Sequence, residues 1–516
     1  MKRCGRAILG VAFILLYPVL ADEPVDLQMV TRIKQEGLNN SQVMETLSYL
    51  TDVHGPRLTG SPNYKIAAEW CRYQLSEWGL ENARLESWAF GRGWSIERYS
   101  AEMLEPYYMN IIAYPKAWTP GTNGAMSGQP LAISLEEEDL EQYRGKLAGA
   151  IVLLGEPRDH EPLFEAEAQR YTAEQLTELT GYPEEAGRTT SSRRERFAKY
   201  RAERAKRREL TRFLAQEGAA AVLEASPIAH GTLRVLSGGA FDNDTTASLP
   251  ALVIALEAYN HIARLLKKNI PVKLEINIQT RFHTEDSLGY NVIAEIPGSD
   301  GKLKKEVVML GAHLDSWHAG TGATDNASGC AVMMEAVRIL KALEVNPRRT
   351  IRIALWGGEE QGLLGSEDYV KKYFADPKTM DLKPDHANFS AYYNLDNGTG
   401  KIRGIYLQES EAVRPIFEAW LKPFHDMGAA TVTFRKTRST DHVSFDAVGL
   451  PGFQFIQDPI EYFSRTWHTN MDVYDHLLAD DLKQMSVIVA AFVYHTAMRD
   501  EKLPRKPLPQ KTGDRR

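Results

Sequence analysis

The second half of the chain alternates short apolar runs with longer amphipathic segments. Buried strands are predicted by four apolar runs, at 307–310, 351–356, 391–395 and 452–456. Helices are predicted by three segments whose apolar positions recur every three to four residues, at 331–343, 365–374 and 482–498. Strands that alternate with helices are typical of an α/β fold. We therefore expect a mixed, largely parallel sheet flanked by helices.

The first half of the chain is less regular. Helical spacing at 41–50 and 64–79 is followed by a strand-rich stretch up to about residue 120. From about 125 to 275, short apolar runs surround a long polar segment, and this change predicts an inserted unit. We expect the N-terminal part of the main domain at 22–124, the insertion at 125–275, the rest of the main domain at 276–500 and a flexible tail at 501–516.

The N-terminus resembles an export signal. Residues 2–6 include three basic side chains, residues 7–20 are almost wholly apolar, and small residues precede the polar stretch that begins at Asp22. This order predicts a cleaved secretory signal at 1–21. A membrane anchor is the alternative, but the apolar run is short for a span and Pro18 interrupts it. We expect a secreted or periplasmic protein with no stable membrane anchor after signal cleavage.

The charges along the chain nearly balance. With 61 Lys and Arg residues against 68 Asp and Glu residues, the net charge is −7, which excludes a nucleic-acid binder held by bulk charge. The segment 188–210 departs from this balance, with ten Arg or Lys and three Glu. We interpret it as a solvated helix of the insertion, with a nucleic-acid or membrane-surface contact as the alternative. We expect no nucleic-acid partner.

Three cysteines are too few for a disulfide scaffold or a cysteine-built zinc module. Cys71 and Cys330 both lie in stretches with helical spacing. We expect both to be buried free thiols.

Acidic and histidine side chains follow the predicted strands. His313 and Asp315 follow the first strand, the pair Glu359 and Glu360 follows the second, and Asp396 follows the third. Two further residues complete the set: His468, after the fourth strand, and Asp325, just before a helix. Because ligands bind at the carboxyl ends of the strands in an open α/β sheet, we expect these side chains to lie close together.

Two histidines and three carboxylates suit a pair of zinc ions with nitrogen and oxygen ligands. One carboxylate must be shared between the ions, and each ion needs one histidine and one further carboxylate. The candidates for this set are His313, Asp325, Glu360, Asp396 and His468. Glu359 is left over as general base to a zinc-activated water, and Asp315 is placed to orient the His313 imidazole.

Three runs carry a family resemblance: Gly311–Trp317, Gly322–Gly329 and Leu355–Gly362. They resemble the co-catalytic zinc exopeptidases, which include bacterial aminopeptidases and carboxypeptidase Q (plasma glutamate carboxypeptidase). The runs 55–61, 439–441 and 481–485 are similar to the carboxypeptidase Q branch in particular. The resemblance implies a zinc-exopeptidase fold of the phosphorylase/hydrolase-like type with an inserted protease-associated β/α domain. It also suggests a homodimer.

The resemblance assigns roles within the candidate site. One zinc would take His313 and Asp396, the other Glu360 and His468, and Asp325 would bridge them. Glu359 would act first as base and then as acid, and a cis peptide bond is implied between Asp325 and Asn326.

One position departs from the family. Relatives often carry Tyr or His just before the last His ligand, as a donor to the tetrahedral intermediate, whereas this chain has Trp467. Its indole N–H donates with a different reach. Asp441 and His442 are further candidates for substrate contact.

These residues predict an exported metallo-exopeptidase that cleaves peptides at their ends, or dipeptides. A receptor-like binding protein of the same fold, without catalysis, is the alternative. The complete ligand set and the base favour the enzyme. Which terminus of the peptide substrate is recognised stays open, because aminopeptidases, dipeptidases and carboxypeptidases use the same metal centre.

Overall fold

The computed structural model describes residues 23–135, 139–182, 202, 206–207, 209–242 and 248–509. In this part the strands form three sheets, of eight, five and four strands. The predicted signal at 1–21 and most of the basic segment 188–210 lie outside the described residues. No helix of the described part is long and apolar enough to cross a membrane.

The eight-stranded sheet is the centre of the main domain. In sheet order its strands are β1 (Glu81–Ala89), β11 (Leu288–Ile296), β13 (Thr350–Trp356), β12 (Val307–His313), β14 (Phe389–Asn394), β17 (Gly452–Gln457), β15 (Ile402–Tyr406) and β16 (Thr431–Thr433). Strands β13, β12, β14 and β17 are parallel, whereas β1, β11 and β15 join by antiparallel pairing. The expected mixed, largely parallel sheet is confirmed.

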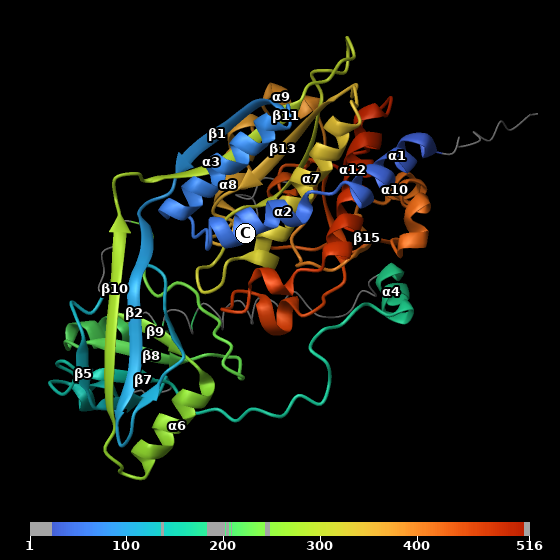
Figure 1. Cartoon of the computed structure of the whole chain (residues 1–516). Coiled ribbons are helices and arrows are strands. Elements are labelled where there is room, and N and C mark those ends of the chain that lie inside the picture. Colours follow the sequence, from blue (N-terminus) through green and yellow to red (C-terminus); the bar gives the residue numbers. More distant parts are fainter. Residues whose placement is uncertain are drawn as a thin grey trace, which may run out of the picture.

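Helices cover both faces of this sheet (Figure 1). One face packs against α1 (Leu27–Asn39), α2 (Val43–Ser48), α3 (Pro62–Glu77), α7 (Ser328–Ala342), α10 (Arg414–Leu421) and α12 (Ala479–Met498). The other packs against α8 (Leu364–Tyr373) and α11 (His442–Asp446), with α9 (Pro384–Asn388) close by. Along β12, Val308 and Leu310 face the first layer and Met309 faces the second. Burial on both faces explains why the strands read as continuous apolar runs.

The five-stranded sheet lies below the main domain in Figure 1. Its strands, in order, are β4 (Ala113–Pro115), β9 (Ala251–Ile254), β8 (Ala221–Ala225), β7 (Ile151–Leu154) and β6 (Pro130–Ile133). Helix α6 (Leu256–Lys267) packs against it. The four-stranded sheet combines the long strands β2 (Gly93–Glu105) and β10 (Lys273–His283) with β3 (Met109–Asn110) and β5 (Met126–Gly128). Strands β2 and β10 run side by side from the main domain down along the five-stranded sheet, against which they pack.

Helix α4 (Ala173–Thr180) lies apart from the strands that precede it in the chain. An extended segment carries the chain from β7 to α4, which packs beside β16 on the main domain (Figure 1). The side chain of Arg170 fastens this segment by ion pairs with Asp458, at 2.9 Å, and Asp481, at 2.6 Å. The expected free thiols, Cys71 and Cys330, are both buried and unpaired.

Candidate metal centre

The candidate side chains gather at one edge of the eight-stranded sheet. His313 is the last residue of β12, Glu359 and Glu360 follow β13, and Asp396 follows β14. These strands are parallel neighbours, so their carboxyl ends meet at the same edge. His468 reaches this edge from a loop beyond β17.

Two groups of side chains share Asp325. His313 Nε2 lies 3.3 Å from Asp325 Oδ1 and 3.3 Å from Asp396 Oδ1. On the other side, His468 Nε2 lies 3.2 Å from Asp325 Oδ2 and 3.0 Å from Glu360 Oε2. Within each group the nitrogen and oxygen atoms lie within 4.8 Å of one another, close enough to hold a metal ion. The structure thus brings together all five residues proposed as ligands.

The chemistry of these atoms fits two divalent cations. Glu360 Oε1 is buried without a hydrogen-bond partner among the described residues, and the buried Asp325 Oδ2 has only the His468 contact at 3.2 Å. In that part of the chain, neither carboxylate nor that of Asp396 forms an ion pair with Lys or Arg. Buried anionic oxygens without partners are costly, and metal ions would compensate them. Histidine nitrogen and carboxylate oxygen in this mixture suit zinc.

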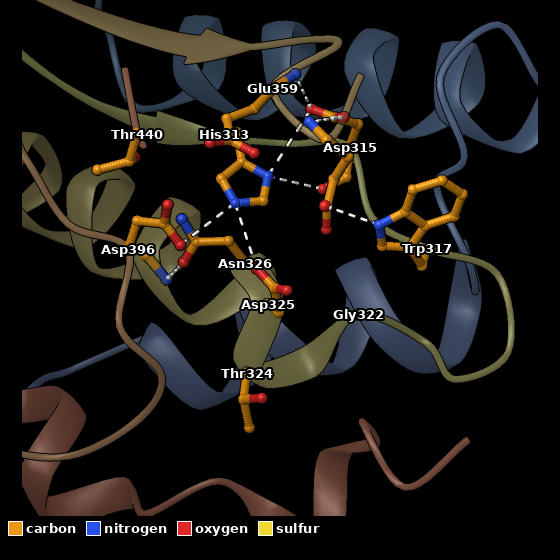
Figure 2. Close-up of polar contacts among 12 residues, drawn as sticks. His313, Asp315, Trp317, Gly322, Thr324, Asp325, Asn326, Glu359, Asp396 and Thr440 are labelled. Atoms are coloured by element: carbon orange, nitrogen blue, oxygen red, sulfur yellow. Dashed lines mark hydrogen bonds and ion pairs between the residues drawn. The ribbon is translucent and has the colours of Figure 1, made fainter. Parts of the chain in front are cut away.

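Asp315 contacts the neighbouring strand end as well as His313 (Figure 2). The His313 Nδ1 atom lies 3.0 Å from the backbone oxygen of Asp315 and 3.7 Å from its carboxylate. The carboxylate accepts hydrogen bonds from the backbone N–H groups of Glu359 and Glu360, both at 3.2 Å, and from the Thr59 hydroxyl at 3.0 Å. Asp315 therefore orients the imidazole through its backbone, and its carboxylate fixes the Glu359–Glu360 turn.

Electrostatics differ between Glu359 and the candidate ligand His468. Burial, together with the carboxylates of Asp396 and Asp441, raises the pKa of Glu359 well above its ordinary value. Burial lowers the pKa of His468, but Glu360 and Asp325 more than offset this, and the result is a pKa of about 10. Without cations, the carboxylates thus favour protonated histidine.

Arg57 was not predicted as part of the site. Its fully buried guanidinium donates to the backbone oxygens of Leu314 and Thr321, which both lie in the loop between His313 and Asp325. The acceptors are Leu314 (2.7 Å), Thr321 (2.7 Å), Gly322 (2.8 Å), Leu50 (2.9 Å) and Gly55 (3.2 Å). The loop between His313 and Asp325 is therefore tied to the N-terminal segment. The run 55–61 was noted only for its family resemblance.

Two other residues that contact the candidate ligands were also not predicted. The Asp472 carboxylate accepts from the backbone N–H groups of Thr324 (2.6 Å) and Asp325 (3.2 Å). Trp317 Nε1 donates to Glu360 Oε2 at 2.8 Å. Each bonds a candidate ligand, and Asp472 adjoins the cis Asp325–Asn326 bond that the resemblance implies and the structure contains.

The three candidates for substrate contact lie differently. The Trp467 ring packs on the His468 imidazole, with centroids 4.1 Å apart. Asp441 and His442 are completely buried, and their polar side-chain atoms have no hydrogen-bond partner among the described residues. Burial raises the pKa of Asp441 to about 7 and lowers that of His442 to about 4. In this conformation neither Asp441 nor His442 reaches the surface, so substrate contact by either stays a prediction.

Comparison with known proteins places this geometry in context. Residues 291–493 match the sequence profile of peptidase family M28. Carboxypeptidase Q of Mus musculus is 27% identical over 475 residues, which cover 91% of this chain and 88% of that protein. A solved peptidase M28 precursor from Shewanella amazonensis SB2B is 23% identical with a TM-score of 0.66, over 94% of this chain and 99% of its own. A zinc aminopeptidase from Bacillus subtilis is 20% identical with a TM-score of 0.56, over 89% and 95%. These two structures share the fold of this chain.

Proposed function

We propose, since residues 291–493 belong to peptidase family M28, that this metallopeptidase is an exported exopeptidase with two zinc ions per chain. The observation that carries the proposal is the pair of ligand groups that share Asp325. His313 and Asp396 would hold one ion, and Glu360 and His468 the other. Residues 1–21 would direct export, and the region of the five-stranded sheet would be the inserted protease-associated domain.

When bound, a zinc pair supplies Lewis acidity that polarises the scissile carbonyl and lowers the pKa of a water. Glu359 lies outside both ligand groups, and its backbone is fixed by Asp315. Its carboxylate is therefore the base that takes the proton of the attacking water and returns it to the nitrogen of the leaving amine. The Trp467 indole packs beside His468, and its N–H would donate to the substrate.

The alternative, a receptor-like binding protein without catalysis, is disfavoured by this arrangement. The residues for the ligands and the base are all present, and the carboxylate oxygens are arranged for cations. A homodimer is also proposed, from the resemblance alone.

Metal analysis and peptide hydrolysis test the proposal together. We expect two equivalents of zinc per chain, loss of activity after dialysis against a chelator, and recovery when zinc is restored. No bound zinc and hydrolysis that a chelator does not change would contradict it. A dipeptide, an N-blocked peptide and a C-amidated peptide, assayed in parallel, separate the specificities. Cleavage of the N-blocked peptide excludes an aminopeptidase, and cleavage of the C-amidated peptide excludes a carboxypeptidase.

A further inference from the structure

A segment near the five-stranded sheet lies against the loop that carries His468. This segment, Gly231–Val235, pairs with residues 468–470 in a short antiparallel arrangement. The Val235 N–H donates to the His468 oxygen at 3.0 Å, and the Asn470 N–H donates to the Leu233 oxygen at 3.1 Å. The Asn470 side chain accepts from the Leu233 N–H at 2.7 Å. A candidate ligand is therefore held by backbone from outside the eight-stranded sheet.

The segment is itself fastened to the five-stranded sheet. Leu233 and Val235 are buried with Val253 of β9 in one apolar cluster. Ser226, just beyond β8, donates its hydroxyl hydrogen to the Thr232 oxygen at 2.6 Å. Since its anchors belong to the sheet, the segment transmits the position of that sheet to the His468 loop.

His468 needs such support because of its backbone. Its φ is +60°, in the left-handed region that residues other than glycine rarely adopt. Residues in that region keep their conformation only where the surrounding contacts fix it, and here Val235 supplies the contact to the His468 oxygen.

Side chains also join this segment to the His468 loop. The Arg234 guanidinium carbon lies 5.0 Å from the centre of the Trp467 ring, which packs in turn on the His468 imidazole. Arg234 forms no ion pair with any described residue; its Nε atom is buried without a hydrogen-bond partner, and its Nη2 atom donates only to the Phe463 oxygen, at 3.4 Å. Its contact with Trp467 is thus a cation–π contact that holds the indole next to the ligand.

We propose that Gly231–Val235 is a positioning element of the metal centre, with Arg234 and Asn470 as the positioning residues for His468 and Trp467. The proposal rests on the function proposed above, because it assigns His468 to a metal. It also gives the insertion a role in the chemistry. The loop that carries His468 has all of its supporting contacts only when the five-stranded sheet lies against it. Residues that support a metal ligand from outside change metal affinity about 10–100-fold when they are replaced.

The experiment measures zinc release against chelator concentration in the full chain, with the melting temperature of the metal-free protein as a second readout. The variants are Asn470→Ala, which removes the acceptor for Leu233, and Arg234→Gln, which removes the cation. Asn260→Ala is the matched control, because the Asn260 side chain bonds the backbone of Arg158 in the same way, at 3.1 and 2.7 Å, but within the insertion. Arg281→Gln is the second control, since Arg281 has 62% of its side chain exposed.

We expect Asn470→Ala and Arg234→Gln to lose one of two zinc equivalents at a chelator concentration about 10–100-fold lower than wild type needs. Arg234→Lys, which keeps the cation, should recover most of this loss. Both controls should retain zinc like wild type. Unchanged zinc retention in Asn470→Ala and Arg234→Gln overturns the inference, and so does a lower melting temperature of the metal-free protein without a change in zinc affinity. A wild-type protein that binds no zinc would instead contradict the proposed function.

Discussion

Replacing Arg57 by methionine tests whether this guanidinium holds the loop between His313 and Asp325. The change keeps much of the apolar stem and removes every donor. Five backbone oxygens then lose a bond. The Gly322 oxygen still accepts a hydrogen bond from the Ala327 N–H, at 2.9 Å. The oxygens of Leu314, Thr321 and Gly55 have no other donor among the described residues.

The magnitude follows from these unpaired oxygens. A buried acceptor without a partner costs about 1–3 kcal/mol, and the oxygens of Thr321 and Gly55 are only partly buried and can bind water. The two fully buried oxygens that lose their partner are those of Leu314 and Leu50, so we expect Arg57→Met to lower the free energy of unfolding by about 2–6 kcal/mol. Arg57→Lys keeps the charge and up to three donors, so its loss should be smaller.

Urea denaturation followed by circular dichroism measures this difference. Arg281→Met is the control, because an exposed side chain of the same type should change stability by less than about 0.5 kcal/mol. If Arg57→Met were as stable as that control, the guanidinium would not hold the loop, and the reasoning would be refuted.

Two further predictions concern neighbouring residues. Asp315→Asn leaves one side-chain oxygen to accept from two backbone N–H groups, so zinc affinity should fall about 10–100-fold in a chelator titration, and unchanged affinity would contradict the proposed role. Burial lowers the pKa of His318 to about 4, whereas the unfolded chain titrates near 6.5. Between these pH values only the unfolded state binds the proton. The contribution of His318 to the free energy of unfolding should therefore be fully present above pH 6.5 and fall by about 1.4 kcal/mol per pH unit down to pH 4. His318→Gln should flatten this part of the stability profile, and an identical profile for the variant would show that another group titrates there.

The central sheet and the gathering of the candidate ligands at one of its edges could be predicted from the sequence, for a physical reason. Strands buried on both faces leave unbroken apolar runs, as in β12 and β13, and parallel strands bring the residues after them to one edge. The positions of His313 and Glu360 therefore followed from local patterns alone.

The supporting contacts could not be predicted in the same way. Arg57 and Asp472 act on backbone groups far away in the sequence, and such contacts leave no periodic pattern. The same holds for Val235, whose N–H supports His468 across more than 200 residues. Helix α1 was missed because its buried face consists only of Val30, Ile33 and Gly37, so few apolar residues mark its helical spacing. The direction of the Asp315 carboxylate depends on the turn after β13, which spacing does not define.

The most direct test of the two-zinc exopeptidase is Glu359→Gln, assayed for bound zinc and for turnover of a dipeptide in the same preparation. Glutamine keeps the shape of the side chain but cannot accept the proton, and general base catalysis contributes about 10²–10⁴-fold. We predict two equivalents of zinc and a turnover number lower by that factor. A variant that retains zinc and turns over peptide at nearly the wild-type rate would contradict the account.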